Sequence, residues 1–222
     1  MEMTRDKLAG MIDHSALKAA ATESDIRRLC QEAMEYRFAC VSTNSAYVAL
    51  AAKLLAGSGV KVDATVGFPL GAASTAAKVC ETEDSIHNGA EEIDMVMNVG
   101  AVKSGNDALA ERDIAAVVEA AGAKVTKVII ETCYLSEEEK RRACAIVRRV
   151  GPTFIKTSTG FGAAGATVED IRLLKELVGD GIQVKAAGGI DSCRKALELL
   201  AAGATRLGLS RGPKIIQEFQ AT

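Results

Sequence analysis

The chain has 222 residues, of which 48% are hydrophobic and 25% are charged, and its formal net charge is −2. That length can bury a sizeable core, and the near-neutral charge argues against the strongly basic face that nucleic-acid or anionic-membrane binding requires. We therefore expect a small-molecule partner, with no nucleic acid and no membrane.

The spacing of the cysteines and histidines bears on whether the protein contains disulfides or a metal site. The six cysteines include no C-x-x-C pair, which favours reduced thiols in the cytoplasm. The two histidines, His14 and His87, have neither H-x-H nor H-x-x-x-H spacing, so we expect no metal. No apolar run is long enough to cross a membrane, and residues 1–7 lack the apolar core of a signal peptide.

Short β-rich runs alternate with longer stretches of helical periodicity, as in repeated βα units on a parallel sheet. The expected strands are residues 38–43, 60–68, 93–98, 127–132, 153–159, 183–187 and 205–210. The expected helices are residues 22–36, 45–56, 75–89, 106–121, 136–150, 167–177 and 192–202. Thr22 with Asp25, and Ser136 with the glutamates after it, are typical helix starts.

The strand count favours a closed barrel. Seven strands are one short of a (β/α)₈ barrel, and the apolar segment 10–14 supplies the eighth. The alternative, a doubly wound open sheet, usually carries a G-x-G-x-x-G turn after its first strand, and no such turn follows the first expected strand of this chain. We predict a single-domain (β/α)₈ barrel over residues 1–222.

Lys156 is the first candidate for chemistry, because it lies on the expected strand 153–159. A buried ammonium must be partnered, lose its proton or turn to solvent, and this segment alone leaves the last option open. Lys185 lies on the neighbouring expected strand. Two close ammonium groups repel, so we expect Lys185 to hold Lys156 partly deprotonated as a nucleophilic amine.

Two acids on apolar strands are candidate partners for these lysines. Asp94 is flanked by Ile93 and Met95, and Glu131 follows two isoleucines. Two amines and an inward acid are the parts of Schiff-base carbonyl chemistry, in which one lysine forms the imine and the other groups move protons. We expect Asp94 to serve proton transfer rather than fold stability.

Glycines after the later strands favour a phosphate site, because barrels of this class often bind phosphate there. Glycine lets the backbone approach an anion, although a Gly-Gly pair alone is weak evidence, since helix-entry turns also use glycine. The residues assigned to substrate and phosphate binding are Gly160, Gly188, Gly189, Gly208, Ser210 and Arg211.

The chain resembles the 2-deoxyribose-5-phosphate aldolase family, class I aldolases built on a (β/α)₈ barrel. The segments that carry the resemblance occur in order through nearly the whole chain. They are Ile12-Asp13-His14-Ser15-Ala16-Leu17-Lys18, Thr65-Val66-Gly67-Phe68-Pro69-Leu70-Gly71, Glu92-Ile93-Asp94-Met95-Val96-Met97-Asn98, Lys127-Val128-Ile129-Ile130-Glu131-Thr132, Phe154-Ile155-Lys156-Thr157-Ser158-Thr159-Gly160-Phe161 and Lys185-Ala186-Ala187-Gly188-Gly189-Ile190.

The resemblance implies reversible cleavage of 2-deoxy-D-ribose 5-phosphate to D-glyceraldehyde 3-phosphate and acetaldehyde, within deoxyribonucleotide catabolism and without a cofactor. It assigns the Schiff base to Lys156 and the proton relay to Lys185 and Asp94. Supporting positions fall on Asp13, Cys40 and Thr157. Barrels of this kind often associate, so we expect a homo-oligomer, either a dimer or a tetramer, although no interface stripe stands out.

Two positions depart from the family pattern. The family's last phosphate loop commonly reads Gly-Thr-Ser-Ser-Gly, whereas Arg211 stands in this one, and a proline usually occupies the position of Ala19. We predict that Arg211 contacts phosphate, because guanidinium binds it in two places; a side chain turned to solvent is the alternative. Two other functions stay open, a non-catalytic phosphosugar sensor and another phosphosugar lyase or isomerase.

Overall fold

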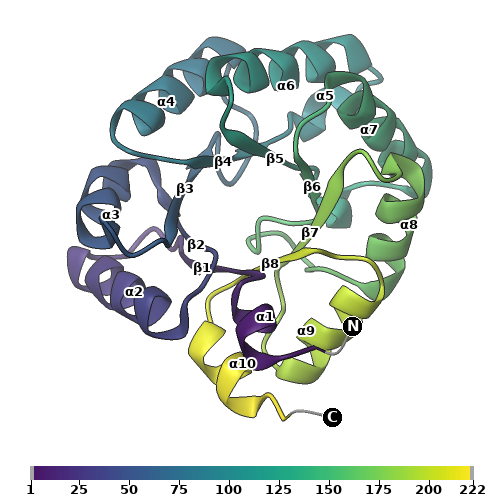
Figure 1. Ribbon diagram of the computed structural model, residues 1–222. Coiled ribbons are helices and arrows are strands. Elements are labelled where there is room, and N and C mark those ends of the chain that lie inside the picture. Colours follow the sequence, from purple (N-terminus) through teal and green to yellow (C-terminus); the bar gives the residue numbers. More distant parts are fainter. Residues whose placement is uncertain (1–2, 221–222) are drawn as a thin grey trace.

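The computed structural model describes residues 3–220, so the outermost residues of the expected domain, 1–2 and 221–222, lie outside it. Within that range, parallel strands form a closed barrel in sequence order (Figure 1). They are β1 (Ile12–Ala16), β2 (Cys40–Asn44), β3 (Lys61–Val66), β4 (Glu92–Val96), β5 (Val125–Ile129), β6 (Phe154–Lys156), β7 (Gln183–Ala187) and β8 (Arg206–Leu209). Pairing of β1 with β8, for example Ile12 with Leu207, closes the ring. This closure confirms the predicted barrel and confirms segment 10–14 as the source of its first strand.

Helices surround the barrel as an outer ring (Figure 1). In residues 3–220 they are α1 (Arg5–Ala9), α2 (Glu23–Tyr36), α3 (Val48–Leu55), α4 (Thr75–His87), α5 (Val99–Lys103), α6 (Asp107–Ala121), α7 (Glu137–Val150), α8 (Val168–Val178), α9 (Cys193–Ala201) and α10 (Gly212–Glu218). The sequence pattern does not predict α1, α5 and α10, because helices of five to seven residues are too short to show a full apolar period. None of the described helices is long and apolar enough to cross a membrane.

Side-chain caps explain where two of the predicted helices begin. At α2, Thr22 and Asp25 form a reciprocal capping box, in which the backbone N–H of Thr22 donates to Asp25 Oδ2 at 2.9 Å and that of Asp25 donates to Thr22 Oγ1 at 3.3 Å. Ser136 and Glu139 form the same arrangement at α7. Each box satisfies backbone donors that the first helical turn leaves free, so both starts are local properties of the sequence.

One strand differs from its prediction in a way that matters for the site. The expected strand 153–159 ends at Lys156, and residues 157–167 form a loop that leads to α8. Gly160, with a φ of 85°, lies in this loop. Lys156 is therefore the last residue of β6 and stands at the mouth formed by the carboxyl ends of the strands.

Charged side chains fill much of the barrel interior, where the fold usually has layers of branched aliphatic residues. Lys127 on β5 lies 3.6 Å from Asp13 on β1, across the barrel. The neighbours that alternate with these residues along the strands, such as Ile12 and Val128, belong to the hydrophobic core. Three more charged residues are completely buried here: Asp63, Asp94 and Lys185.

Candidate active site

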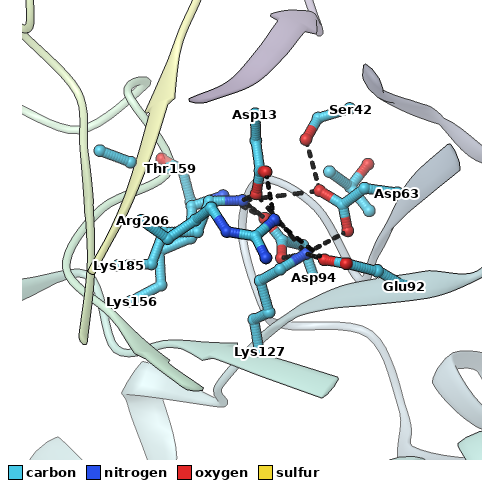
Figure 2. Close-up of polar contacts among 12 residues, drawn as sticks. Asp13, Ser42, Asp63, Glu92, Asp94, Lys127, Lys156, Thr159, Lys185 and Arg206 are labelled. Carbon is cyan, nitrogen blue, oxygen red and sulfur yellow. Dashed lines mark hydrogen bonds and ion pairs between the residues drawn. The ribbon is translucent and has the colours of Figure 1, made fainter. Parts of the chain in front are cut away.

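Two lysines and one aspartate meet at the mouth of the barrel. Lys156 and Lys185 are register partners on β6 and β7. Both ammonium groups donate to the same oxygen, Asp94 Oδ2, at 2.5 Å from Lys156 Nζ and 2.8 Å from Lys185 Nζ (Figure 2). The structure therefore brings together the three residues that the sequence assigns to Schiff-base chemistry.

A second set of charged residues lies beneath these three, and sequence reasoning missed it. Lys127 Nζ lies 2.8 Å from Asp63 Oδ1, 2.8 Å from Glu92 Oε2 and 3.0 Å from Asp94 Oδ1. The other oxygen of the shared aspartate is thus held by a third lysine (Figure 2). Asp63 sits between the apolar residues Val62 and Ala64, so the signal that singled out Asp94 could have found it as well, whereas Lys127 has the polar Thr126 on one side.

The buried charges in this cluster balance. Asp13 lies 2.5 Å from Lys185 Nζ and 2.7 Å from Arg206 Nη1, and Ser42 donates a hydrogen bond to Asp63. With all groups ionised, the described cluster holds four cations, Lys127, Lys156, Lys185 and Arg206, and four carboxylates, Asp13, Asp63, Glu92 and Asp94. Buried charges need such partners, so removing one member leaves another uncompensated.

Among the lysines of this cluster, Lys156 is the one whose pKa is lowered. Burial lowers the pKa of Lys156, the charge of Asp94 opposes that effect, and the ammonium of Lys185 lowers the pKa further. The predicted influence of Lys185 therefore has the expected sign, but desolvation of the buried amine is the larger cause.

The other two residues keep their charges. Although burial favours the neutral form, Asp13 and Asp94 hold the pKa of Lys185 above its usual range. Burial likewise opposes ionisation of Asp94, but the ammonium groups of Lys127, Lys156 and Lys185 hold its pKa well below the usual range. These opposite pKa shifts leave Lys156 the more easily deprotonated of the two neighbouring lysines and Lys185 protonated, which is what the predicted assignment of the nucleophile to Lys156 requires.

The predicted supporting residues occupy different places. Asp13 contacts Lys185 directly, as described above. Thr157 links β6 to β7, because its hydroxyl donates to the carbonyl of Ala187 at 3.2 Å and accepts from the N–H of Ala187 at 3.1 Å. Cys40, the first residue of β2, lies 3.4 Å from Arg206 Nη1, and its described contacts include neither Lys156 nor Lys185.

Cys40 also belongs to a group of possible metal ligands, with Asp13 and Glu92, whose donor atoms lie within 4.8 Å of one another. Cations of the protein already occupy this group. Arg206 Nη1 lies 2.7 Å from Asp13 and 3.5 Å from Glu92, and Lys127 Nζ lies 2.8 Å from Glu92. Burial raises the pKa of the Cys40 thiol well above its usual range, which disfavours the thiolate that binds metals.

A cavity of about 600 Å³ opens above the two lysines, and its lining includes both of them. Four predicted substrate-binding residues also line it and share one property, a backbone N–H that donates to no acceptor within residues 3–220. Successive free N–H groups form concave anion sites. These four residues are Gly160, Gly188, Gly189 and Ser210.

The two remaining predicted substrate residues have other roles. Gly208 lines the cavity, but a Cβ there would lie 3.0 Å from Lys185 Cε, so glycine makes room for the lysine. Arg211 is exposed and is not among the residues that line the cavity. It is the N-cap residue of α10, and its place outside the cavity lining does not support the predicted contact between Arg211 and phosphate.

The expectation that Glu131 partners one of the lysines is wrong, because no ion pair joins Glu131 to a lysine within residues 3–220. It accepts hydrogen bonds from Thr159 on the loop after β6, at 3.2 Å from its backbone N–H to Oε1 and at a shorter distance from its hydroxyl to Oε2. The side chain serves that loop instead of either candidate amine.

Comparison with known proteins agrees with this geometry. A model of the DeoC/LacD family of aldolases matches residues 7–218. The chain belongs to this family. The resemblance on which the site was assigned is thereby confirmed, while the roles of single residues remain predictions.

Relatives in the family are similar over almost their whole length. The deoxyribose-phosphate aldolase of Aciduliprofundum boonei is 53% identical over 221 residues, 98% of this chain and 99% of that protein. The deoxyribose-phosphate aldolase of Carboxydothermus hydrogenoformans is 53% identical over 215 residues, 95% of this chain and 94% of that protein. The solved deoxyribose phosphate aldolase of Aeropyrum pernix, described as a unique tetramer, has a TM-score of 0.90 at 32% identity, over 96% of this chain and 91% of that one.

Proposed function

We propose that this protein is a class I aldolase that reversibly cleaves 2-deoxy-D-ribose 5-phosphate to D-glyceraldehyde 3-phosphate and acetaldehyde through a lysine Schiff base. One observation carries the proposal: the amines of Lys156 and Lys185 converge on one oxygen of Asp94, at 2.5 and 2.8 Å, on the floor of the cavity. Family membership and the named relatives support the same substrate.

In the proposed reaction the neutral amine of Lys156 adds to the C1 aldehyde of the open-chain sugar, and the resulting carbinolamine takes up one proton and loses water to form an iminium; the same proton is released when the free amine is regenerated. A base removes the proton of the C3 hydroxyl, the C2–C3 bond breaks, and its electron pair moves toward the iminium nitrogen to form an enamine. D-Glyceraldehyde 3-phosphate leaves. Protonation of the enamine at C2 and addition of water then release acetaldehyde and the free amine, with Asp94 and Lys185 moving protons through water.

The free N–H groups at the cavity rim suit the phosphate of this substrate. Gly188 and Gly189 have φ values of 82° and 69°, which glycine adopts without strain. Because they follow β7, and Ser210 follows β8, the anion site falls at the last two loops of the barrel. A phosphate bound there would leave the aldehyde end of the sugar free to reach the lysines below.

A phosphate dianion also needs a cation, and Lys18 supplies one. Lys18 lines the cavity, and within residues 3–220 its ammonium contacts no carboxylate. The other cations of the lining are paired, since the two active-site lysines contact Asp94 and Arg28 donates to Asp25 at 2.8 Å. The loop after β1 lies beside the loop after β8, because these strands pair.

Lys18→Met is therefore expected to raise KM for deoxyribose 5-phosphate roughly fivefold, as an exposed charge-assisted contact is lost. The kinetic constants for unphosphorylated deoxyribose should stay unchanged. Arg211→Ser serves as the matched control, because Arg211 does not line the cavity. This variant should leave the kinetic constants for both sugars unchanged. A larger KM effect from Arg211→Ser than from Lys18→Met would restore the original assignment of phosphate to Arg211.

The test of the proposed function is release of acetaldehyde from deoxyribose 5-phosphate, measured beside other phosphosugars. A sensor would bind the sugar without turnover. A different lyase or isomerase would act on another phosphosugar. Either result would contradict the proposed activity.

The Lys185→Leu variant tests how the nucleophile is kept neutral. The ammonium of Lys185 lowers the pKa of Lys156 and shares the charge of Asp94, so its removal should raise that pKa. Because only the neutral amine forms the imine, trapping of Lys156 with acetaldehyde and borohydride should move to higher pH. Lys124→Leu, an exposed lysine ahead of β5, is the control. An unshifted profile in Lys185→Leu would mean that burial alone sets the pKa.

The proposal also includes self-association of the protein and a cytoplasmic location. The description of the Aeropyrum pernix aldolase as a tetramer supports a homo-oligomer, a dimer or a tetramer. Light scattering coupled to size-exclusion chromatography measures the mass directly, and a single species at the mass of one chain would contradict association.

A further inference from the structure

Glu131 is a buried acid that the proposed reaction does not use. Its residue is 2% exposed, and within residues 3–220 no lysine, arginine or histidine forms an ion pair with it. Its backbone φ is 52°, in the left-handed region that side-chain-bearing residues seldom adopt. Such a conformation persists only where surrounding contacts hold it, and it is often found at functional sites.

Most hydrogen bonds of Glu131 come from one residue of the loop between β6 and α8, and Cys133 Sγ is a further donor to Oε1 at 3.9 Å. The backbone N–H of Thr159 lies 3.2 Å from Oε1 and 3.3 Å from Oε2, and the hydroxyl of Thr159 donates to Oε2. The same hydroxyl accepts a hydrogen bond from the N–H of Phe161 at 3.0 Å. Because a hydroxyl has a single hydrogen, Thr159 has none left to donate to a ligand.

This segment forms one wall of the cavity. Thr159, Gly160 and Phe161 all line it, and the N–H of Gly160 has no acceptor within residues 3–220. The far end of the loop is held separately, since the N–H of Ala166 donates to the carbonyls of Ala187 and Gly188 at 3.0 and 3.1 Å. The near end, between Lys156 and Gly160, is held at Thr157 by its hydrogen bonds to Ala187 and at Thr159 by the carboxylate of Glu131. Residues 159–161 therefore take their position from Glu131.

We propose that Glu131 is a positioning residue that holds residues 159–161 so that the N–H of Gly160 faces the substrate phosphate, and that it thereby sets the affinity for phosphorylated substrates. The inference rests on the proposed function for the identity of the anion. Glu131 touches neither lysine of the site, so its effect falls on phosphate binding and leaves imine chemistry intact.

The test compares Glu131→Gln, Thr159→Val and the double variant on deoxyribose 5-phosphate and on unphosphorylated deoxyribose. Each single change should raise KM for the phosphorylated sugar at least about fivefold, with kcat and the unphosphorylated reaction within about twofold of the original protein. The double variant should be no worse than the stronger single variant, because both changes act on the hydrogen bond between the Thr159 hydroxyl and Glu131. Glu138→Gln, an exposed acid on α7, is the matched control.

Glu131→Gly guards against misfolding, because a φ of 52° suits glycine and the change removes the carboxylate without adding strain. It should show the same selective rise in KM with an unchanged thermal midpoint. An unchanged KM in the variants, an additive double variant, or equal losses on both sugars with a lowered midpoint would each overturn the inference.

Calorimetric titration with inorganic phosphate separates this inference from the proposed function. Weaker phosphate binding by Glu131→Gly than by the original protein supports the positioning role, and equal binding overturns it. Both results stand even if the original protein cleaves no deoxyribose 5-phosphate, an outcome that would remove only the proposed substrate.

Discussion

Lys156→Met is expected to abolish covalent trapping with acetaldehyde and borohydride and to reduce turnover by at least about 10⁴-fold, because within residues 3–220 the only other lysine that lines the cavity beside Asp94 is Lys185. Lys185 keeps its charge beside Asp13 and Asp94, so it cannot substitute as a nucleophile near neutral pH. Peptide mass mapping of the trapped original protein should place the label on the peptide that contains Lys156.

The variant should fold, because Lys156 stands at the edge of the charge cluster and methionine keeps an unbranched side chain as far as the ε position. The other cations of the cluster remain, so Asp94 still has Lys127 at 3.0 Å and Lys185 at 2.8 Å. Lys124→Met, at an exposed position, controls for loss of a lysine elsewhere. Persistent labelling of Lys156→Met, or a label on a peptide without Lys156, would contradict the assigned nucleophile.

Asp94→Asn is expected to lower turnover by about 10²- to 10⁴-fold, because an amide cannot exchange a proton with the reacting atoms. The charge of Asp94 raises the pKa of Lys156, so its removal should move imine trapping to lower pH even as turnover falls. Trapping profiles and steady-state rates, measured on the same preparation, separate these two effects. Turnover near that of the original protein would exclude proton transfer by Asp94.

The same change should also destabilise the fold, which revises the expectation that Asp94 serves proton transfer alone. Asp94 is completely buried, and removing its charge leaves three ammonium groups short of a partner, at a cost of about 3 kcal/mol or more. Because the folded pKa of Asp94 is depressed, its contribution is present above the unfolded value of about 4 and is lost as pH falls through the folded value. Unfolding free energies of the two proteins should therefore converge only in strong acid.

A charge-compensated double variant, Asp94→Asn with Lys127→Met, separates catalysis from stability. It leaves three cations, Lys156, Lys185 and Arg206, facing three carboxylates, Asp13, Asp63 and Glu92. Stability should recover in part, while turnover stays low. If both recovered together, the kinetic loss in Asp94→Asn would be a consequence of unfolding.

The sequence alone determined the barrel and the residues most directly tied to the chemistry. Alternation of β-rich and helical runs is local, and so are the capping boxes at Thr22 and Ser136, which explains why most element positions follow from the pattern. Lys156, Lys185 and Asp94 stand out because an ionisable residue on an apolar strand is unusual wherever the strand packs.

The pairing of these charges depends on the closed barrel and does not follow from the sequence pattern. Arg206 on β8 meets Asp13 on β1, and Lys127 on β5 meets Asp63 on β3, through register and closure that no local pattern encodes. Two further assignments depended on three-dimensional placement. Glu131 faces Thr159 instead of a lysine, and Arg211 lies outside the cavity. Residue type and periodicity show which side chains are unusual, whereas the partner of each buried charge depends on distances that exist only after the chain has folded.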